Sequence, residues 1–449
     1  MLELPRSLRI AIFTVIISVA AAWAVVDPRN FLLFLSYFIT ILFSAWGAYH
    51  FFLLIVGISG PPLEPERLKW LYPKISIIIP AMNEPLLART IEVCLFHTDY
   101  PDDRKEIVVV ADDPAGERTG YWYEQKYPTR VKVLARKQYY PTKPSALNDA
   151  LTLCTGDIIA VMDVEDIPER DVFMKAAAAI SRNGYDAVQA ILRINNAEDS
   201  WITRIFNLEY AGWFRVWLNA RYRLGIYAPL GGTGNYFKRS ILSQVGGWDA
   251  TNLAEDAEVG VRLAIAGGKV AVINSRHWEE APVTYDAWLR QRTRWFRGWM
   301  QSLWKYFWFL LSPTARKRLG FWRLLSVVLM LIGPFMVVFN WLAYVLTAFW
   351  FLDEYHITHL NYSQAVPVWS FVPLVFNLVY YLAWLEGGSL EGIGKKSKLV
   401  KYVPHMFVYC NFMMPLAALR ALYQEIFKGI FWEKTTHPGR GVRWRVSGT

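Results

Sequence analysis

The sequence lacks the glycine-rich loops that cradle nucleotide phosphates in two common folds. No GxGxxG motif follows a strand pattern, and there is no GxxxxGK[ST] motif. Both absences argue against a dinucleotide-binding domain and a P-loop nucleotide-hydrolysing domain. Cysteine is also scarce, since Cys94, Cys154 and Cys410 are the only three and form no CxxC pair. The chain therefore offers neither a disulfide framework nor a cysteine zinc site, which fits a reducing cytosolic environment.

Charge is missing from four long stretches of the chain. Charged residues make up 19% of the sequence and hydrophobic residues 54%, an apolar balance for a soluble protein. The uncharged stretches are residues 10–26, 31–63, 324–352 and 364–385. Because a helix needs about 20 apolar residues to cross a bilayer, we expect four membrane spans, the first two joined by a turn at residues 27–30. Small residues late in the first stretch also allow a cleaved signal peptide.

Basic residues are distributed unevenly around the third and fourth stretches. The net charge is +10, yet the intervening loop, residues 353–365, contains no lysine or arginine. Basic residues instead precede the third stretch and follow the fourth: Arg316, Lys317, Arg318, Arg323, Lys395, Lys396, Lys398 and Lys401. The positive-inside rule then predicts a multi-pass protein of the plasma (inner) membrane, with the middle region and C-terminus cytosolic. Basic residues in these positions indicate contact with anionic membrane lipids rather than with nucleic acid.

The middle region has the texture of an α/β domain. Short β-branched runs alternate with helical patterns, at residues 75–79, 106–111, 131–134, 157–163 and 186–192. This alternation predicts a largely parallel sheet, with ligands bound beyond the carboxyl ends of its strands. We expect membrane helices over residues 1–60, a cytosolic domain over 61–320, further membrane and interfacial helices over 321–430, and a cytosolic tail over 431–449.

Three further segments are amphipathic or interrupted. Residues 201–223 and 285–308 mix tryptophan and phenylalanine with arginine, which is typical of helices at the membrane interface. In the second we expect Trp299, Trp304 and Phe307 to face the membrane. Residues 402–419 are apolar but broken by polar residues and prolines. We favour an interfacial helix there, with a fifth span as the alternative.

Carboxylates follow several of the predicted strands. Asp112 comes after the second strand, while Asp163 and Glu165 come after the fourth and point to one side because they are two residues apart. Hard oxygen ligands so placed suit Mg²⁺ or Mn²⁺ carried by a diphosphate. Glu255 and Asp256 begin a predicted helix. A turn or a helix cap would also explain each of these acids taken alone.

The order of the motifs is more specific than any one motif. The chain contains, in sequence, "IIIPAMNE", "VADD", "KPSALNDAL", "DVED", "GGTGNYFKRSILSQVGGWD", "AEDAEVG" and "QRTRW". This series resembles the inverting family 2 glycosyltransferases, above all the membrane-integrated cellulose, hyaluronan and mannan synthases. The resemblance covers roughly residues 70–300. It implies a GT-A fold, an α/β nucleotide-sugar domain inserted between transmembrane helices.

The resemblance implies a donor site. Asp112 would hold the nucleobase, and Asp163 with Glu165 would bind Mg²⁺ or Mn²⁺; the family pattern is D-x-D, so the glutamate leaves the metal preference open. The remaining nucleotide-sugar contacts would be Pro80, Asn83, Glu84, Lys143, Gln291, Arg294 and, in a tail that resembles a gating loop with Trp432 and His437, Thr435. Taken without the resemblance, Lys143 is an ordinary solvated lysine and the tail a disordered basic segment.

The resemblance also implies the catalytic and acceptor residues. Asp256 would be the general base with Glu255 beside it, although Ala254 replaces the family's threonine. Gly232, Thr233 and Trp295 would contact the acceptor; alone, the glycines also fit a tight turn.

We therefore expect an inverting, processive transferase that makes a β-linked polysaccharide from a nucleotide sugar, first of all a UDP-hexose, and exports it. Transfer of one sugar to a glycolipid or polyprenyl-phosphate carrier is the alternative with the same chemistry. A transporter that has lost catalysis, or a nucleic-acid-binding protein, fits the intact motifs less well.

Overall fold

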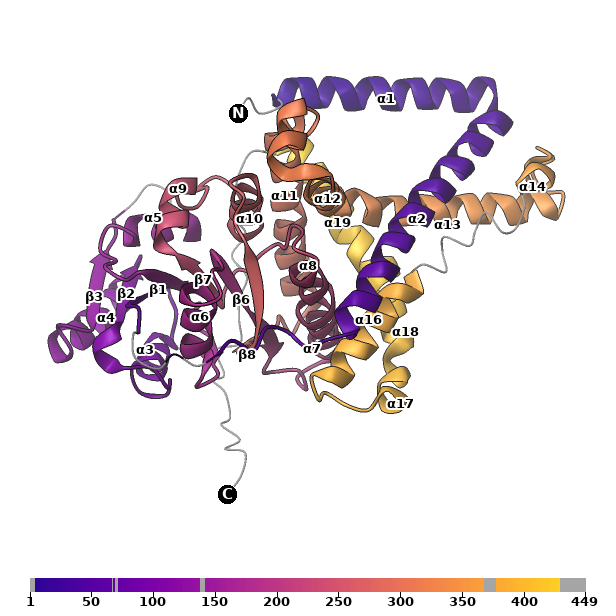
Figure 1. Cartoon of the computed structure of the whole chain (residues 1–449). Coiled ribbons are helices and arrows are strands. Elements are labelled where there is room, and N and C mark those ends of the chain that lie inside the picture. The colour runs from indigo at the N-terminus through magenta and orange to yellow at the C-terminus, as the bar shows by residue number, and fades with distance from the viewer. Residues whose placement is uncertain (1–4, 67, 69–71, 138–141, 367–376, 429–449) are drawn as a thin grey trace.

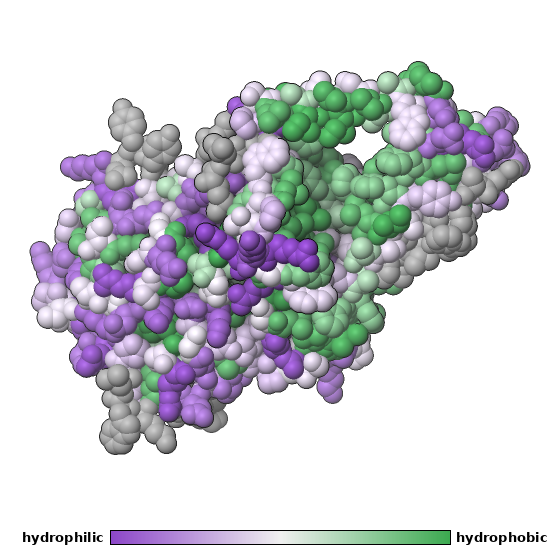
Figure 2. All heavy atoms as spheres, turned by 45° about the horizontal axis from the view of Figure 1, so that its top comes forward, coloured by the Kyte–Doolittle hydropathy of each residue, from purple (hydrophilic) through white to green (hydrophobic). Residues whose placement is uncertain are grey.

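The computed structural model describes residues 5–66, 68, 72–137, 142–366 and 377–428. An α/β domain lies at one end of the molecule and long helices extend from it at the other (Figure 1). Hydrophobic residues cover these helices, whereas hydrophilic residues dominate the surface of the α/β domain (Figure 2). The two ends of the molecule thus differ in the polarity of their surfaces.

One mixed sheet forms the centre of the α/β domain, with the strand order β3-β2-β1-β4-β7-β6-β8-β5. The strands are β1 Ile75–Ala81, β2 Lys105–Ala111, β3 Val131–Ala135, β4 Ile158–Val161, β5 Ile167–Pro168, β6 Ala187–Ile194, β7 Asn235–Lys238 and β8 Val270–Glu279. Strands β3, β2, β1 and β4 are parallel to one another, as are β6 and β8. Strand β7 runs antiparallel between β4 and β6, and β5 runs antiparallel to β8. The five predicted strands are confirmed, while β5, β7 and β8 were not anticipated.

The strands are buried on both faces, which explains their unbroken hydrophobic sequences. Every residue of β2 and of β6 is buried, as expected for strands covered by helices on each side. The covering helices are α3 Leu87–Phe96, α4 Pro114–Lys126, α5 Lys143–Ala150, α6 Val172–Ser181, α9 Arg239–Val245 and α10 Glu255–Ile265. Because β1, β2, β4, β6 and β8 share one direction in this arrangement, their carboxyl ends meet at one edge of the sheet.

Four helical segments of the described residues are long and apolar enough to cross a membrane. They are α1 Arg6–Val26, α2 Pro28–Ile58, α13 Gly333–Glu354 and the run Lys396–Phe427, which joins α17 Lys396–Leu399, α18 Val403–Val408 and α19 Met414–Phe427 through short 3₁₀ and π turns. The turn predicted between the first two spans is present, and the Asp27 carboxylate accepts a hydrogen bond from the Asn30 amide at the start of α2. These helices suggest a membrane protein.

The other predicted spans differ from the structure in part. The third is divided between α12, Pro313–Leu331, and α13, because Gly333 and Pro334 start a new helix. Part of the fourth, residues 367–376, lies outside the described residues; α14 Tyr362–Ala365 and α16 Asn377–Leu390 flank it. Residues 402–419, expected at the interface, belong to the helical run long enough to span, so their length and composition favour the alternative of a fifth span.

Residues 201–223, predicted to lie at the membrane interface, expose few of their side chains. They form α7 Trp201–Tyr210, a π-helical turn η2 Ala211–Leu218 and α8 Asn219–Arg223, and most of their side chains are buried in protein. A Cβ on Gly212 would fall 2.5 Å from a ring carbon of Trp384 in α16. The aromatic residues therefore pack between the sheet and the C-terminal helices, where the hydrophobic gain of burial exceeds that of a place in the headgroups.

Helix α11, Tyr285–Leu310, also differs in detail from the expected interfacial helix. Trp299 lines an internal cavity instead of facing the membrane. Trp304 packs edge-on against Phe13 of α1 and Phe335 of α13, with ring centroids 6.1 and 5.7 Å away. The helix is thus a wall between the α/β domain and the apolar helices.

A buried carboxylate attaches the C-terminal helices to the sheet. The Glu391 side chain, just after α16, is fully buried. Its oxygens lie 3.1 Å from Arg193 Nη1, 3.0 Å from Arg276 Nε and 3.7 Å from Arg215 Nε. Arg193 and Arg276 belong to β6 and β8, and Arg215 to η2. One acid therefore holds the link after α16 against three elements of the α/β domain.

Replacing Glu391 with glutamine should destabilise this junction. The change removes the negative charge from three arginines, and breaking a buried ion pair costs about 3–5 kcal/mol. We expect a lower thermal midpoint in lipid nanodiscs and faster proteolysis near residues 387–394. Glu386→Gln is the matched control, because the Glu386–Lys396 pair (2.6 Å) is partly exposed and pairs of that kind contribute at most about 1 kcal/mol. Equal midpoints for the two variants would contradict this role.

Candidate active site

A cavity of about 660 Å³ begins at the carboxyl edge of the sheet and continues between the apolar helices. Twelve of the predicted site residues line it: Pro80, Glu84, Asp112, Lys143, Asp163, Glu165, Gly232, Glu255, Asp256, Gln291, Arg294 and Trp295. Asn83 does not line it. Its backbone amide donates 2.7 Å to Asp113, the cap of α4, and its own side chain is exposed. Thr435 lies outside the described residues, as do Trp432 and His437.

Lys143 stands at the centre of the acidic part of the cavity. Its Nζ lies 2.5 Å from Asp163 Oδ1 and donates 2.7 Å to the Gly232 carbonyl. Desolvation opposes the charge on this ammonium group, but the carboxylates of Asp163 and Glu255 raise the pKa of Lys143 above its ordinary value. The alternative of an ordinary solvated lysine is therefore wrong.

Asp166 fixes the conformation of the loop that follows β4. This carboxylate is fully buried and accepts hydrogen bonds from the Asp163 amide, at 3.1 Å, and from the Thr233 hydroxyl. Desolvation raises the pKa of Asp166 to about 8. Thr233, predicted to contact the acceptor, is 1% exposed and points to Asp166 instead. The prediction for Thr233 is corrected: the threonine holds the glycine loop, and Gly232 presents its backbone to the cavity.

Glu255 and Asp256 form a desolvated pair at the start of α10. Burial raises the pKa of Glu255 to about 7 and that of Asp256 above its ordinary value. Asp256 Oδ1 accepts a hydrogen bond from the Ala257 amide (2.8 Å), so one of its oxygens does bind a backbone amide at the start of the helix. A Cβ on Gly232 would lie 3.6 Å from both Asp256 Oδ2 and Lys143 Nζ, which places the other oxygen at the cavity.

The substitution of Ala254 for the family's threonine has a packing reason. A Cβ on Gly298 of α11 would fall 2.3 Å from the Ala254 Cβ and 2.4 Å from its backbone nitrogen. The two small residues therefore bring α11 into direct contact with the turn that carries Glu255 and Asp256. This contact sets the distance between the carboxylates and the side chains of α11.

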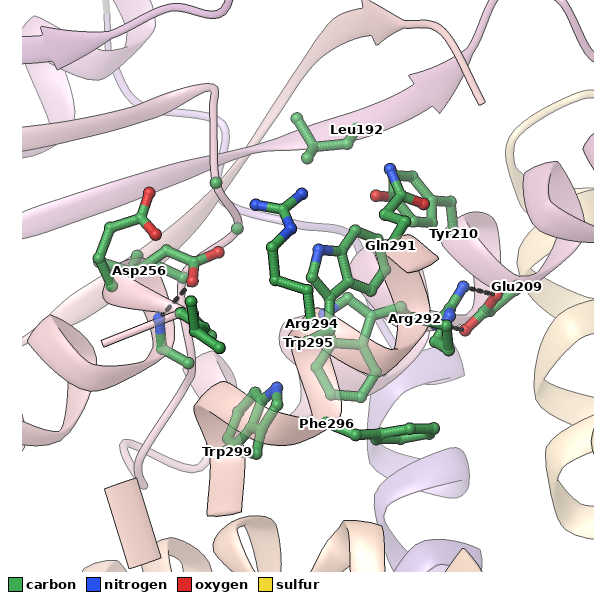
Figure 3. A pocket seen from close by; sticks show the side chains of 18 of the residues that line it. Leu192, Glu209, Tyr210, Asp256, Gln291, Arg292, Arg294, Trp295, Phe296 and Trp299 are labelled. Carbon is green, nitrogen blue, oxygen red and sulfur yellow. Dashed lines mark hydrogen bonds and ion pairs between the residues drawn. The ribbon is translucent and has the colours of Figure 1, made fainter. Parts of the chain in front are cut away.

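The "QRTRW" segment divides its side chains between two tasks. Gln291, Arg294 and Trp295 line the cavity (Figure 3). Arg292 lines it too, but its guanidinium points away from that of Arg294 and donates to both oxygens of Glu209 at 2.7 and 2.8 Å. Desolvation lowers the pKa of Arg294, and the negative charges of Glu255 and Asp256 oppose this effect. Arg294 is thus the cation that faces the acidic pair from α11.

Several cavity residues were missed by the sequence analysis. Glu279 and Glu280 follow one another at the end of β8, and Tyr210 ends α7. The pair of acids in "HWEE" could have indicated Glu279 and Glu280 as site residues. It did not do so because β8 was not recognised as a strand in the sequence. The deeper part of the cavity is lined by aromatic side chains from α2, η2, α11 and α16, namely Trp46, Trp213, Phe214, Trp217, Phe296, Trp299, Tyr380 and Trp384.

The acidic residues fit a metal that arrives with its substrate. Among the described residues no group of three or more histidine, cysteine, aspartate or glutamate side chains could hold a metal ion. Asp163 and Glu165 nevertheless offer two carboxylates on one cavity wall. Mg²⁺ and similar ions are commonly bound by one or two carboxylates together with substrate phosphates. The donor set therefore suits a divalent ion shared with a diphosphate.

Comparisons with known proteins agree with this geometry. Residues 73–298 match the family described as "Glycosyltransferase like family 2". A probable glycosyltransferase of Bacillus subtilis, YdaM, is 33% identical over 263 residues, which are 56% of this chain and 62% of that protein. A beta-monoglucosyldiacylglycerol synthase of Synechocystis is 26% identical over 89% of this chain and 85% of its own length. A poly-beta-1,6-N-acetyl-D-glucosamine synthase of Staphylococcus epidermidis is 24% identical over 78% and 84%.

A solved structure shows the same fold. The mannosyltransferase PcManGT from Pyrobaculum calidifontis, in complex with GDP-Man and Mn²⁺, superposes with a TM-score of 0.56 at 17% identity and covers 88% of this chain and 99% of that one. With the match over residues 73–298 and the acidic cavity at the carboxyl edge, the chain belongs to the family 2 glycosyltransferases of GT-A fold.

Proposed function

We propose that this transferase is inverting and processive and makes a β-linked polysaccharide from a nucleotide sugar, first of all a UDP-hexose. The observation that carries the proposal is the continuity of the cavity. It runs from Asp256 and Arg294 past Trp299 to Trp217 and Trp384, between the apolar helices. A growing glycan thus has a path that leads away from the site of transfer.

The donor half of the cavity has the chemistry of a nucleotide diphosphate site. Asp112 lies at the end of β2 with its carboxylate 3.3 Å from Arg136 Nε, where it can accept hydrogen bonds from a nucleobase. Lys143 and Arg294 supply positive charge for the diphosphate. Asp163 and Glu165 would hold Mg²⁺ or Mn²⁺, which when bound supplies charge to stabilise the leaving phosphate.

Asp256 is the base in this proposal. It removes the proton from an acceptor hydroxyl as that oxygen forms a bond to the anomeric carbon. The bond from this carbon to the diphosphate breaks, and the nucleoside diphosphate leaves with the electron pair. A positioned carboxylate contributes about 10²- to 10⁴-fold to such a step, and fixed cations near the leaving group add electrostatic stabilisation. Because attack and departure occur on opposite faces, an α-linked donor gives a β-linkage.

Aromatic walls suit a pyranose chain. The flat apolar faces of sugar rings pack on aromatic rings, while polar groups beside the rings meet the hydroxyls. Trp46 Nε1 donates 2.7 Å to the Tyr380 hydroxyl, so two of the wall residues are fixed to one another across α2 and α16. His50 and Asn340 add polar groups to the same part of the cavity.

Transfer of a single sugar to a lipid is the second candidate. The deep part of the cavity is also lined by Met330, Met336 and Met414, whose flexible apolar side chains fit an acyl chain, and by Val337. The Synechocystis relative named as a glycolipid synthase aligns over 89% of this chain. Both observations support a lipid acceptor.

The catalytic domain lies on the cytosolic side of the plasma membrane in this proposal. Exposed Arg316, Lys317 and Arg318, at the start of α12, support this orientation under the positive-inside rule.

Product analysis tests the proposal. Protein in lipid nanodiscs with Mn²⁺ or Mg²⁺ is given radiolabelled UDP-glucose, UDP-N-acetylglucosamine or GDP-mannose, and the product is sized. We expect one donor to yield a long glycan that is not extracted into organic solvent. Asp256→Asn should abolish it while donor binding, measured by calorimetry, is retained.

A product that stays extractable into organic solvent and carries one sugar would contradict processivity and support the second candidate. Full activity of Asp256→Asn would contradict the assignment of the base.

Arg294→Lys should slow turnover although it keeps the positive charge. A lysine cannot bind a phosphate as a planar fork, and loss of one stabilising donor at a developing charge typically costs about 10²- to 10³-fold. We expect a fall in kcat of this order or somewhat less. Arg290→Lys is the control, because Arg290 is exposed on the same helix. Equal kcat values for both variants would show that Arg294 does not face the leaving group.

The rate should rise with pH through an ionisation that lies above the ordinary range of an aspartate. The base must be ionised, and burial raises the pKa of both Asp256 and Glu255, the latter to about 7. Glu255→Gln should move this limb to lower pH, because the neighbouring negative charge is removed. A rate independent of pH between 5 and 8 in the wild type would exclude a desolvated base.

A further inference from the structure

Glu279 brings a carboxylate to the cavity that the proposed mechanism does not use. It is the last residue of β8, and it pairs with Ile194 at the end of β6. The residue before it, Trp278, pairs with Ile167 in β5, directly after the "DVED" loop. The strand register therefore places Glu279 at the same edge of the sheet as Asp163, although 116 residues separate them (279 − 163).

Tyr210 connects Glu279 to the acceptor side of the cavity. Both side chains line the cavity, and that of Tyr210 lies close enough to the Glu279 carboxylate to interact with it electrostatically. The Tyr210 ring, 7% exposed, stacks with Trp295 at a centroid distance of 6.4 Å and an interplanar angle of 24°. Figure 3 shows Tyr210 and Gln291 together on the side of Trp295 away from Asp256. Glu279 thus adjoins, through Tyr210, the ring on which an acceptor sugar is expected to stack.

The polar atoms here are hydrogen-bond acceptors. Burial raises the pKa of Glu279 above its ordinary value, but a carboxylate remains a poor partner for a diphosphate in any ionised state, because like charges repel. Gln291 is 6% exposed, and its Oε1 has no hydrogen-bond partner in the described part of the chain. Buried acceptors of this kind need donors. Sugar hydroxyls supply such donors and diphosphates do not.

We propose that Glu279, beside Tyr210, binds hydroxyl groups of the acceptor sugar stacked on Trp295 and so presents one particular hydroxyl to Asp256. Glu279 is a specificity residue of the acceptor site and takes no part in activating the donor. This inference rests on the proposed function, since it requires that sugar is transferred to a sugar acceptor.

The test compares transfer with hydrolysis. A transferase without acceptor slowly passes the donor sugar to water, and that reaction needs the donor site and the base but not the acceptor site. For Glu279→Gln we expect unchanged donor hydrolysis and donor KM. Transfer to a soluble oligosaccharide acceptor should fall roughly 10- to 100-fold, with a higher acceptor KM, as for loss of one hydrogen bond to a charged group.

Tyr210→Phe, which keeps the ring and removes the hydroxyl, should change the same quantities in the same direction by a smaller factor. It also keeps the inference open to refutation if Glu279→Gln does not fold. Glu198→Gln is the control. The Glu198 side chain is 85% exposed, and this substitution removes an equal charge away from the cavity.

Three results separate this inference from the proposed function. Wild-type protein that hydrolyses a donor but transfers to no sugar acceptor would overturn the proposed function, and this inference with it. If the wild type is active and the variants transfer sugar equally well, only the inference about the acceptor site is overturned. Equal losses of hydrolysis and transfer would also overturn it, because Glu279 would then serve the donor.

Discussion

The repulsion between carboxylates buried in one cavity is the constraint on which the site depends. Asp163, Glu255 and Asp256 lie close enough that each affects the ionisation of Lys143. Buried charges are tolerated only when they are paired. Lys143 from α5 and Arg294 from α11 supply the opposing charge. A diphosphate with its metal would bring further charge of both signs into the same balance, so the protein is arranged to exchange internal ion pairs for those with the substrate.

This balance requires α11 to be held firmly, and contacts with α7 and with the C-terminal apolar helices hold it. Arg292 binds Glu209 in α7, and the Tyr409 hydroxyl, from the C-terminal helical run, donates to the same carboxylate at 2.6 Å. One turn further on, Arg297 approaches Glu425 in α19 at 3.7 Å. The helix that presents Arg294 to the cavity is therefore fixed in part by contacts with the apolar helices. Catalytic and membrane parts form one unit in which the site is built from both.

Much of the site could be predicted from the sequence because the chemistry depends on short local motifs. Acids that follow hydrophobic strands can be recognised in the sequence, and Asp112 and Asp163 were found in this way, whereas Asp256 was found at the start of a predicted helix and through the order of the motifs. Thr233 was misassigned because its partner, Asp166, lies on a different strand connection and only the fold shows that it turns inward. Glu279 was missed because β8 contains charged and polar residues in a half-buried pattern and so lacks the signature of a central strand.

The membrane part was predicted less well, for a physical reason. Tryptophan, phenylalanine and arginine in residues 201–223 suit an interfacial helix and a protein–protein packing surface equally, and hydropathy alone does not distinguish them. The packing of this segment depends on close backbone contacts. One of them is between Gly57 and Val216, where a Cβ on the glycine would fall 2.3 Å from the valine carbonyl oxygen. Such contacts depend on pairs of elements far apart in the sequence.

The anomeric configuration of the new glycosidic bond tests the central claim most directly. Protein in nanodiscs is given the α-linked nucleotide sugar that it accepts, and the anomeric configuration of the glycosidic bond formed is determined by proton NMR. One base opposite a stabilised leaving group predicts a β-linked product. An α-linked product would require two displacements through a covalent intermediate, and it would contradict the assignment of Asp256 as a general base.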